Sequence, residues 1–114
     1  MTYEIQNLQK LSSAMTKKHE HIIVNHVNDT YVKIAVNEED YPWHYHSNSD
    51  ELFIMIEGEL TIDFQDDKSV TLRPNDTLLV PAGILHRSRP KDRTVNLVIE
   101  RSDTETLFAY KKST

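Results

Sequence analysis

Short stretches of β-branched and aromatic residues recur along this chain, and turn-forming residues separate each stretch from the next. Within the stretches, apolar side chains recur near a period of two, which is typical of β-strands. We expect strands at residues 22–27, 31–36, 52–56, 60–64, 70–72, 77–80 and 95–100. Many short strands at close intervals predict an all-β sandwich or barrel.

The first residues follow a different pattern. Ile5, Leu8, Leu11 and Met15 are spaced like one face of a short helix. The chain has 114 residues, which is enough for one hydrophobic core and one domain. We therefore expect an N-terminal segment, residues 1–20, that packs on a β-barrel formed by residues 21–110.

The composition excludes several classes of function. The sequence has no cysteine, so disulfides, thiolate metal sites and cysteine nucleophiles are absent. The formal net charge is -5 and no basic patch is visible, which argues against nucleic-acid binding. The longest apolar run, residues 52–56, is too short for a membrane span. The N-terminus has an early acid and no signal-peptide core, so the expected location is the cytoplasm.

Three histidines and one glutamate stand at informative positions. His44 and His46 lie two residues apart, so a strand would present both imidazoles on the same face. Glu51 opens the next expected strand after a short turn, and His86 opens a later one. Three imidazoles and one carboxylate suit a divalent transition metal and do not suit a Ca²⁺ cage.

These residues resemble the two sequence motifs of the cupin family. The first cupin motif, G-x5-H-x-H-x(3,4)-E-x6-G, is matched by His44, His46, Glu51 and Gly58, with Glu38 in place of the leading glycine. The second, G-x5-P-x-G-x2-H-x3-N, is matched by Pro81, Gly83 and His86, with Asn75 and Pro90 at its two ends. Asparagine also adopts the left-handed conformation, so Asn75 is a tolerable replacement for glycine.

The resemblance is closest to small single-domain bacterial cupins. It implies a double-stranded β-helix, or jelly-roll, barrel with a short N-terminal helical segment. It also implies that His44, His46, Glu51 and His86 are metal ligands, because all four positions that bind metal in the family are present.

Other residues near the motifs have expected places but no assigned chemistry. Phe53 and Met55 share a strand face with Glu51, so we expect them to line the barrel interior, either as core or as pocket wall. Arg87 is expected at the surface. The pair His19 and His21 has no spaced glutamate or later histidine, and it too is expected at the surface. No catalytic residue is identified from the sequence.

The expected cofactor is one divalent transition metal per chain, and Zn, Fe, Mn, Ni, Co and Cu are not distinguished. Four protein ligands leave about two open positions on a six-coordinate metal. The net charge of about +1 on the ligated ion favours a small anionic or enolisable molecule. Three hypotheses follow: a metal-dependent enzyme of the dioxygenase, isomerase, epimerase or decarboxylase type, a non-catalytic small-molecule binding or sensing module, and a structural metal barrel.

The expected partners are a small molecule and a second copy of the chain. Leu52, Ile54 and Ile56 occupy the strand face opposite to Glu51 and are all apolar. An apolar outer face indicates an interface, and twofold dimers are the commonest oligomers. We expect a homodimer in which residues 1–20 pack across the interface, with no nucleic-acid or membrane partner.

Overall fold

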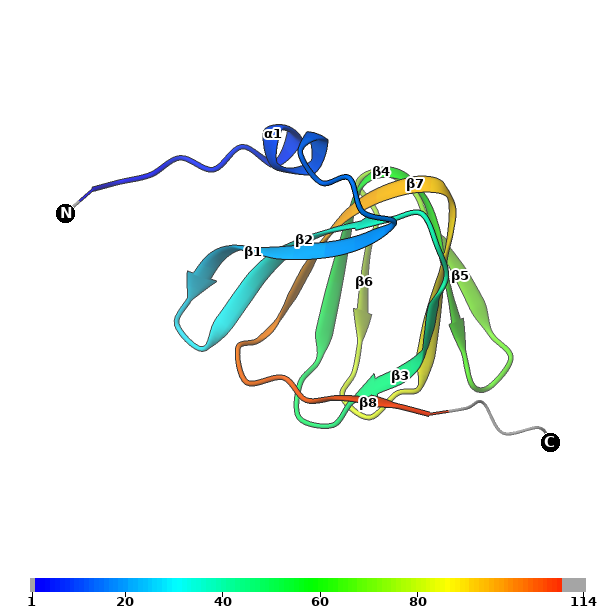
Figure 1. Ribbon diagram of the computed structural model, residues 1–114. Coiled ribbons are helices and arrows are strands. Elements are labelled where there is room, and N and C mark those ends of the chain that lie inside the picture. The colour runs from blue at the N-terminus through cyan, green and yellow to red at the C-terminus, as the bar shows by residue number, and fades with distance from the viewer. Residues whose placement is uncertain (1, 110–114) are drawn as a thin grey trace.

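Residues 2–109, which the computed structural model describes, form a short helix and a curled sheet of eight strands (Figure 1). The elements are α1 (Leu8–Ser13), β1 (His19–Val27), β2 (Thr30–Asn37), β3 (Tyr41–His46), β4 (Glu51–Phe64), β5 (Ser69–Leu72), β6 (Thr77–Val80), β7 (His86–Arg101) and β8 (Thr106–Phe108). This is the all-β double-stranded β-helix that the sequence predicts, together with its short helical segment.

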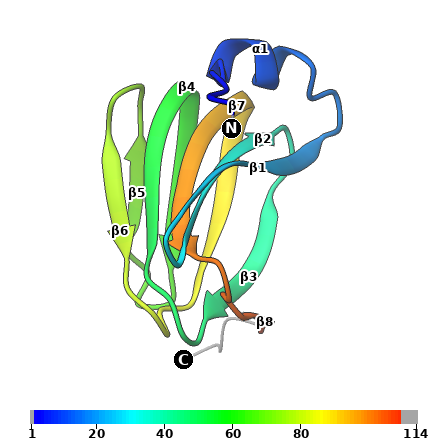
Figure 2. The same cartoon turned by 90° about the vertical axis from the view of Figure 1, so that its left-hand side faces the viewer.

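Two long strands organise the sheet. β4 and β7 pair antiparallel along most of their length. β2 and β3 extend the sheet from β7, and β1 and β8 lie at its ends, whereas β5 and β6 pair with β4. Figure 2 shows β4, β5 and β6 on one side of the barrel and β1, β2 and β3 on the other. The interior of the barrel therefore receives side chains from both halves of the chain.

The long strands differ from the short ones that the sequence predicts. Residues 52–56 and 60–64 belong to one strand, β4, which passes through Gly58 at a φ of 79°. The register between β4 and β7 shifts on both sides of this point. A positive φ and a bulge bend a strand without ending it. Residues 89–92, which include Pro90 and Asp92 and so predict a turn, likewise lie within β7, where Asp92 has a φ of 56°.

The core has two parts, one on each face of the sheet. Inside the barrel the buried apolar residues are Phe53, Met55, Leu60, Ile62, Leu72 and Val80. On the outer face of β1, β2 and β7 they are Met15, Val24, Ile34, Val36 and Val95, and Leu8 and Leu11 of α1 pack against them. Each fully buried side chain of this size contributes about 1.5–3 kcal/mol to folding.

The helix α1 is shorter than the apolar spacing predicts. It begins at Leu8, after Asn7, whose side-chain oxygen accepts a hydrogen bond of 2.9 Å from the Lys10 N–H. Such an asparagine cap satisfies a backbone donor that the first helical turn leaves unpaired. Arg93 of β7 donates to the Ser12 carbonyl at 2.6 Å and ties the helix to the sheet. No helix in the described residues is long and apolar enough to cross a membrane.

The buried carboxylate of Asp63 joins three strands of the sheet, β4, β5 and β7. Asp63 of β4 accepts hydrogen bonds from Arg89, Arg87 and Ser69 at 2.6–3.0 Å. These bonds, that from Arg89 foremost, hold the pKa of Asp63 well below its usual range. Arg87 also lies over the Trp43 ring at 5.0 Å. The Arg87 side chain is 39% exposed, so it lies at the surface as expected, and it is also part of this network.

Candidate metal centre

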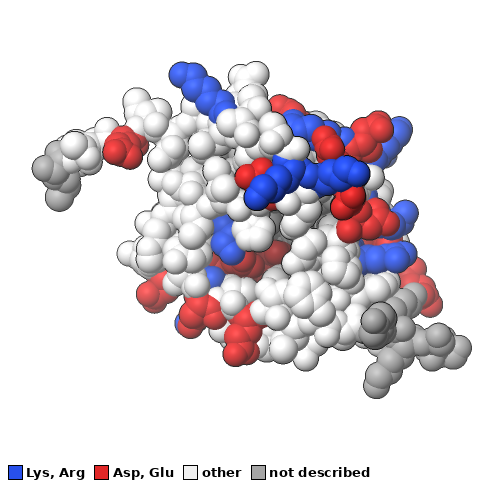
Figure 3. All heavy atoms as spheres, viewed as in Figure 1, with Lys and Arg blue, Asp and Glu red and all other residues white. Residues whose placement is uncertain are grey.

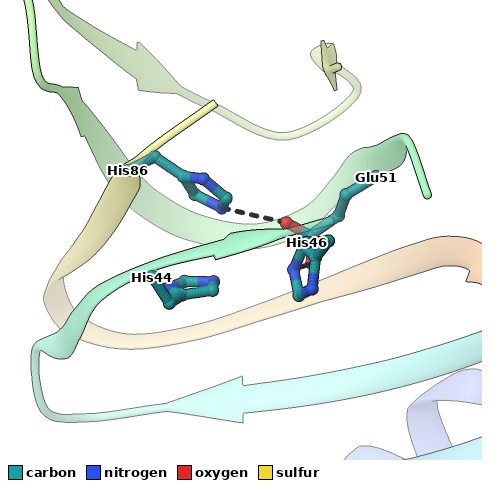
Figure 4. Close-up of side chains that lie close together, drawn as sticks. All are labelled: His44, His46, Glu51 and His86. Atoms are coloured by element: carbon teal, nitrogen blue, oxygen red, sulfur yellow. Dashed lines mark hydrogen bonds and ion pairs between the residues drawn. The ribbon is translucent and has the colours of Figure 1, made fainter. Parts of the chain in front are cut away.

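His44, His46, Glu51 and His86, hereafter the four-residue cluster, converge inside the barrel (Figure 4). One ligand atom from each lies within 4.8 Å of the others, and all four residues are buried. The two histidines of β3 alternate with half-buried Trp43 and Tyr45, as the strand period requires. Glu51 and His86 are the first residues of β4 and β7.

The loops that carry the cluster are tied to one another. The Gly83 N–H donates to the His46 carbonyl at 2.8 Å, and the Ala82 N–H donates to Asp50 Oδ1 at 2.9 Å. Gly83 has a φ of 84°, so the turn before β7 uses a conformation that L side chains rarely adopt. His44 and His86 lie opposite each other in the pairing of β3 with β7. Backbone pairing therefore brings the two motifs of the sequence together.

Hydrogen bonds to the outer ring nitrogens orient the imidazoles. Nδ1 of His44 donates to the Pro42 carbonyl, and Nδ1 of His86 donates to the Ile84 carbonyl, each at 2.8 Å. Nδ1 of His46 lies 3.1 Å from Thr106 Oγ1. A carbonyl only accepts, so in His44 and His86 the proton sits on Nδ1, and Nε2 can serve as a ligand. Metal-binding histidines are commonly held by such partners.

Glu51 lies between two of these Nε2 atoms. Its Oε1 is 3.0 Å from His86 Nε2, and its Oε2 is 3.3 Å from His46 Nε2. Burial raises the pKa of Glu51, but the neighbouring imidazoles of His46 and His86 outweigh burial and lower the pKa to about 2. Glu51 is therefore an ionised carboxylate at neutral pH.

The surroundings of His44 and His46 shift the pKa values of these two histidines in opposite directions. Burial, followed by the neighbouring His86, lowers the pKa of His44 to about 4. Burial also lowers the pKa of His46, but the carboxylate of Glu51 beside it raises that pKa by more. At neutral pH, His44 is a neutral imidazole with a free lone pair, whereas His46 holds its proton more tightly than an unperturbed histidine does.

A cavity of about 140 Å³ adjoins the four-residue cluster. A water molecule needs about 10–15 Å³ of such space, so the cavity holds about ten waters or one small molecule. Lys33, Glu51 and Glu100 are among its lining residues, and Figure 3 shows acidic and basic side chains gathered in a hollow on this side of the molecule. Of the two residues expected in the barrel interior, Phe53 is among those that line the cavity, and Met55 is buried in the barrel core.

Several lining residues were not identified from the sequence. His19 and His21, which the sequence predicts at the surface, lie on β1 at the cavity wall. Lys33 and Glu100 also face the cavity and form an ion pair of 2.9 Å. Glu100 has the same strand parity as Asn96 and Val98, which line the cavity too. That parity is a usable signal, but it requires knowing which face of β7 points inward.

The donor set of the four-residue cluster suits a divalent transition metal. Imidazole nitrogens and a carboxylate oxygen are ligands for Mn, Fe, Co, Ni, Cu and Zn. Nε2 of His46 is buried and has no hydrogen-bond partner among the described residues. A cation between His46, His86 and Glu51 would satisfy this nitrogen and neutralise the carboxylate.

Comparisons with known proteins agree with this arrangement. The family model for the Cupin domain matches residues 30–98. The uncharacterized protein YdbB of Bacillus subtilis (strain 168) is 45% identical over 105 residues, which cover 92% of this chain and 93% of that protein. A cupin-2 domain containing protein from Shewanella frigidimarina superposes with a TM-score of 0.80 at 28% identity, covering 85% of this chain and 94% of that one. Protein NMB1881 from Neisseria meningitidis superposes with a TM-score of 0.79 at 29% identity, covering 87% and 100% respectively.

Proposed function

The chain belongs to the cupin family, and from this premise we propose that it binds one divalent transition metal ion through His44, His46, Glu51 and His86. The observation that carries the proposal is the convergence of four buried ligand atoms within 4.8 Å of one another. The hydrogen bonds at Nδ1 of His44 and His86 support it, because they leave Nε2 of each ring for an ion.

We further propose that the protein is a metal-dependent enzyme for a small anionic or enolisable molecule. A bound ion of this kind polarises a coordinated oxygen and lowers the pKa of bound water. The chain supplies the rest of the site: Glu51 orients two of the imidazoles, Phe53 gives an apolar wall, and the barrel limits access of water. The adjoining cavity favours this proposal over a structural metal, since a structural site is closed around its ion.

A second candidate is a module that binds or senses a small molecule without turnover. The same cavity supports this candidate. A residue with an assigned acid or base role would favour the enzyme, but none has been identified among the described residues. They differ in one measurable way, because only an enzyme converts its ligand. Oxygenase, isomerase, epimerase and decarboxylase reactions are the classes to be assayed first, with and without O₂.

The metal proposal is tested with purified protein that has been stripped of ions and titrated with Co(II), Mn(II) and Zn(II). We expect one ion per chain, and His44→Ala should abolish stoichiometric binding. His26→Ala is the matched control, because His26 lies on β1, does not line the cavity and is outside the cluster. Equal metal binding by wild type and His44→Ala would overturn the proposal.

Turnover is tested with metal-loaded protein and a panel of enolisable acids, catechols and sugar derivatives. Conversion that is lost in Glu51→Ala would support the enzyme. Saturable binding without conversion would favour the sensing module instead. A protein that binds the ion but no small molecule would contradict both candidates.

A further inference from the structure

One buried carboxylate in the cavity has no role in the proposal above. Glu100, on β7, has a side chain that is 6% exposed, so it is buried. Its Oε2 has no hydrogen-bond partner among the described residues, and this oxygen lies 4.0 Å from Nε2 of His46. That Nε2 is the nitrogen that would bind the metal. The free oxygen of Glu100 is therefore aimed at the side of the cavity where a metal-bound ligand would lie.

The other oxygen of Glu100 is held in place. Lys33 Nζ donates to Oε1 at 2.9 Å, and the Lys33 side chain is itself largely buried. β2 and β7 pair in regular register around these two residues, with Tyr31 opposite Glu100 and Lys33 opposite Val98. The ion pair therefore fixes which carboxylate oxygen faces Lys33 and which faces the cavity.

An ionised oxygen that is buried without a partner is unfavourable, so a bound molecule that supplies a hydrogen-bond donor is preferred over one that does not. The charges around it also constrain the molecule. The charges of Lys33 and Glu100 cancel each other. A divalent ion with Glu51 as its one anionic ligand keeps a charge of about +1. An anion with a donor group meets both demands.

We propose that Glu100 selects the ligand of this site, and that the ligand is a small acid of the α-hydroxy class. Its anionic group balances the metal, and its hydroxyl donates to Oε2 of Glu100. This inference rests on the proposed metal site. It adds a recognition residue that lies outside the four-residue cluster.

Lactate and pyruvate are suitable probes because both present a carboxylate and a neighbouring oxygen to a metal. They differ at that second oxygen, which is a donor in lactate and only an acceptor in pyruvate. Glu100→Gln keeps the shape of the side chain. Since Lys33 must face the amide oxygen, the NH₂ group of the glutamine would face the cavity. The variant therefore exchanges an acceptor for a donor at the position that touches the ligand.

The experiment loads wild type and Glu100→Gln with Co(II) and titrates each with lactate and with pyruvate, following the visible absorption of the metal. A hydrogen bond to a charged group changes affinity by about 10- to 100-fold. We expect the preference for lactate over pyruvate to fall by at least about tenfold in the variant. Glu59→Gln is the control, since Glu59 pairs with Arg73 and does not line the cavity.

The outcomes are distinguishable. An unchanged lactate-to-pyruvate ratio in Glu100→Gln overturns the inference and leaves the metal proposal intact. A large loss of Co(II) affinity in Glu100→Gln identifies Glu100 as a metal ligand and also overturns it. If the variant does not fold, wild type alone decides, because pyruvate binding as tightly as lactate, or neither acid binding, contradicts the inference. If the wild type does not bind Co(II), the metal proposal itself is refuted, and the inference on Glu100 fails with it.

Discussion

Two imidazoles of the four-residue cluster, His44 and His46, differ chemically although they share one centre. His44 is held neutral by burial, with a pKa of about 4, whereas the carboxylate of Glu51 raises the pKa of His46. A metal ion competes with a proton for the nitrogen of each histidine. A fall in pH therefore affects metal binding at His46 before it affects binding at His44.

We expect metal affinity to fall as the pH is lowered through the pKa of His46. Glu51 raises that pKa above its ordinary value of 6.5, so the loss begins at a higher pH than it would for an unperturbed histidine. Displacement of one proton gives a loss of about tenfold per pH unit below the pKa. His44 does not add to this loss of metal affinity until the pH approaches 4, because burial has already lowered its pKa. Co(II) titrations between about pH 5.5 and 8 measure the slope, and an affinity independent of pH over this range would contradict the expectation.

The sequence identifies the four-residue cluster better than the cavity around it. His44, His46 and Glu51 can be predicted because residue type and spacing together are informative. Glu100 is a single glutamate near the end of a strand, and the neighbouring sequence does not distinguish a buried glutamate from an exposed one at this position. Its role depends on the strand parity of β7 and on Lys33, which comes from another strand. Asp63 and Arg87 are unpredictable for the same reason, since their pairing is a product of register.

At the scale of elements, the sequence predicts most of the strands, although not β8, and it fails on where the long strands end. Glycine and proline usually mark turns, so Gly58 and Pro90 predict breaks between strands. In a closely curved barrel the same residues bend long strands that continue beyond them. The continuity of β4 and β7 is set by their pairing with each other, which a local pattern does not contain.

The two glycines test this interpretation because both have positive φ but different surroundings. A Cβ at Gly58 would lie 2.7 Å from the Arg93 carbonyl oxygen, whereas one at Gly83 would meet nothing within 4 Å. Backbone strain alone costs about 1–2 kcal/mol for an alanine in this conformation. Gly83→Ala should lower the free energy of unfolding by that amount. Gly58→Ala should lower it by more, because β4 and β7 must also move apart to make room for the Cβ. Urea unfolding of the metal-free variants measures both losses, and equal values would show that the close approach of β7 is unimportant.

At the scale of the whole molecule, apolar side chains remain at the surface. Tyr3 and Ile5 are 89% and 96% exposed, in a segment that runs away from the barrel in Figure 1. Leu79 on β6, which pairs with Leu52, is 54% exposed. Exposed apolar groups of this kind mark interfaces. We therefore propose a homodimer in which the N-terminal segment of each copy covers apolar surface of the other.

Light scattering at micromolar concentration should give the mass of two chains. Ile5→Asp should shift the equilibrium toward the monomer, since it places a charge in the proposed interface. Glu4→Gln is the control, because it alters a neighbouring exposed residue that is already polar. A monomeric mass for the unaltered chain would refute the dimer.

Two residues of the four-residue cluster, Glu51 and His86, are 35 positions apart in the sequence yet lie 3.0 Å apart in space. An ion bound to both would act as a cross-link between distant parts of a chain that contains no cysteine. Closing a long loop in this way removes conformational freedom from the unfolded chain. Because the complete site exists only in the folded barrel, an ion at about 100 times its dissociation constant would add about 2.7 kcal/mol to the free energy of unfolding. The metal supply of the cell would then affect the stability of the fold as well as the occupancy of the site.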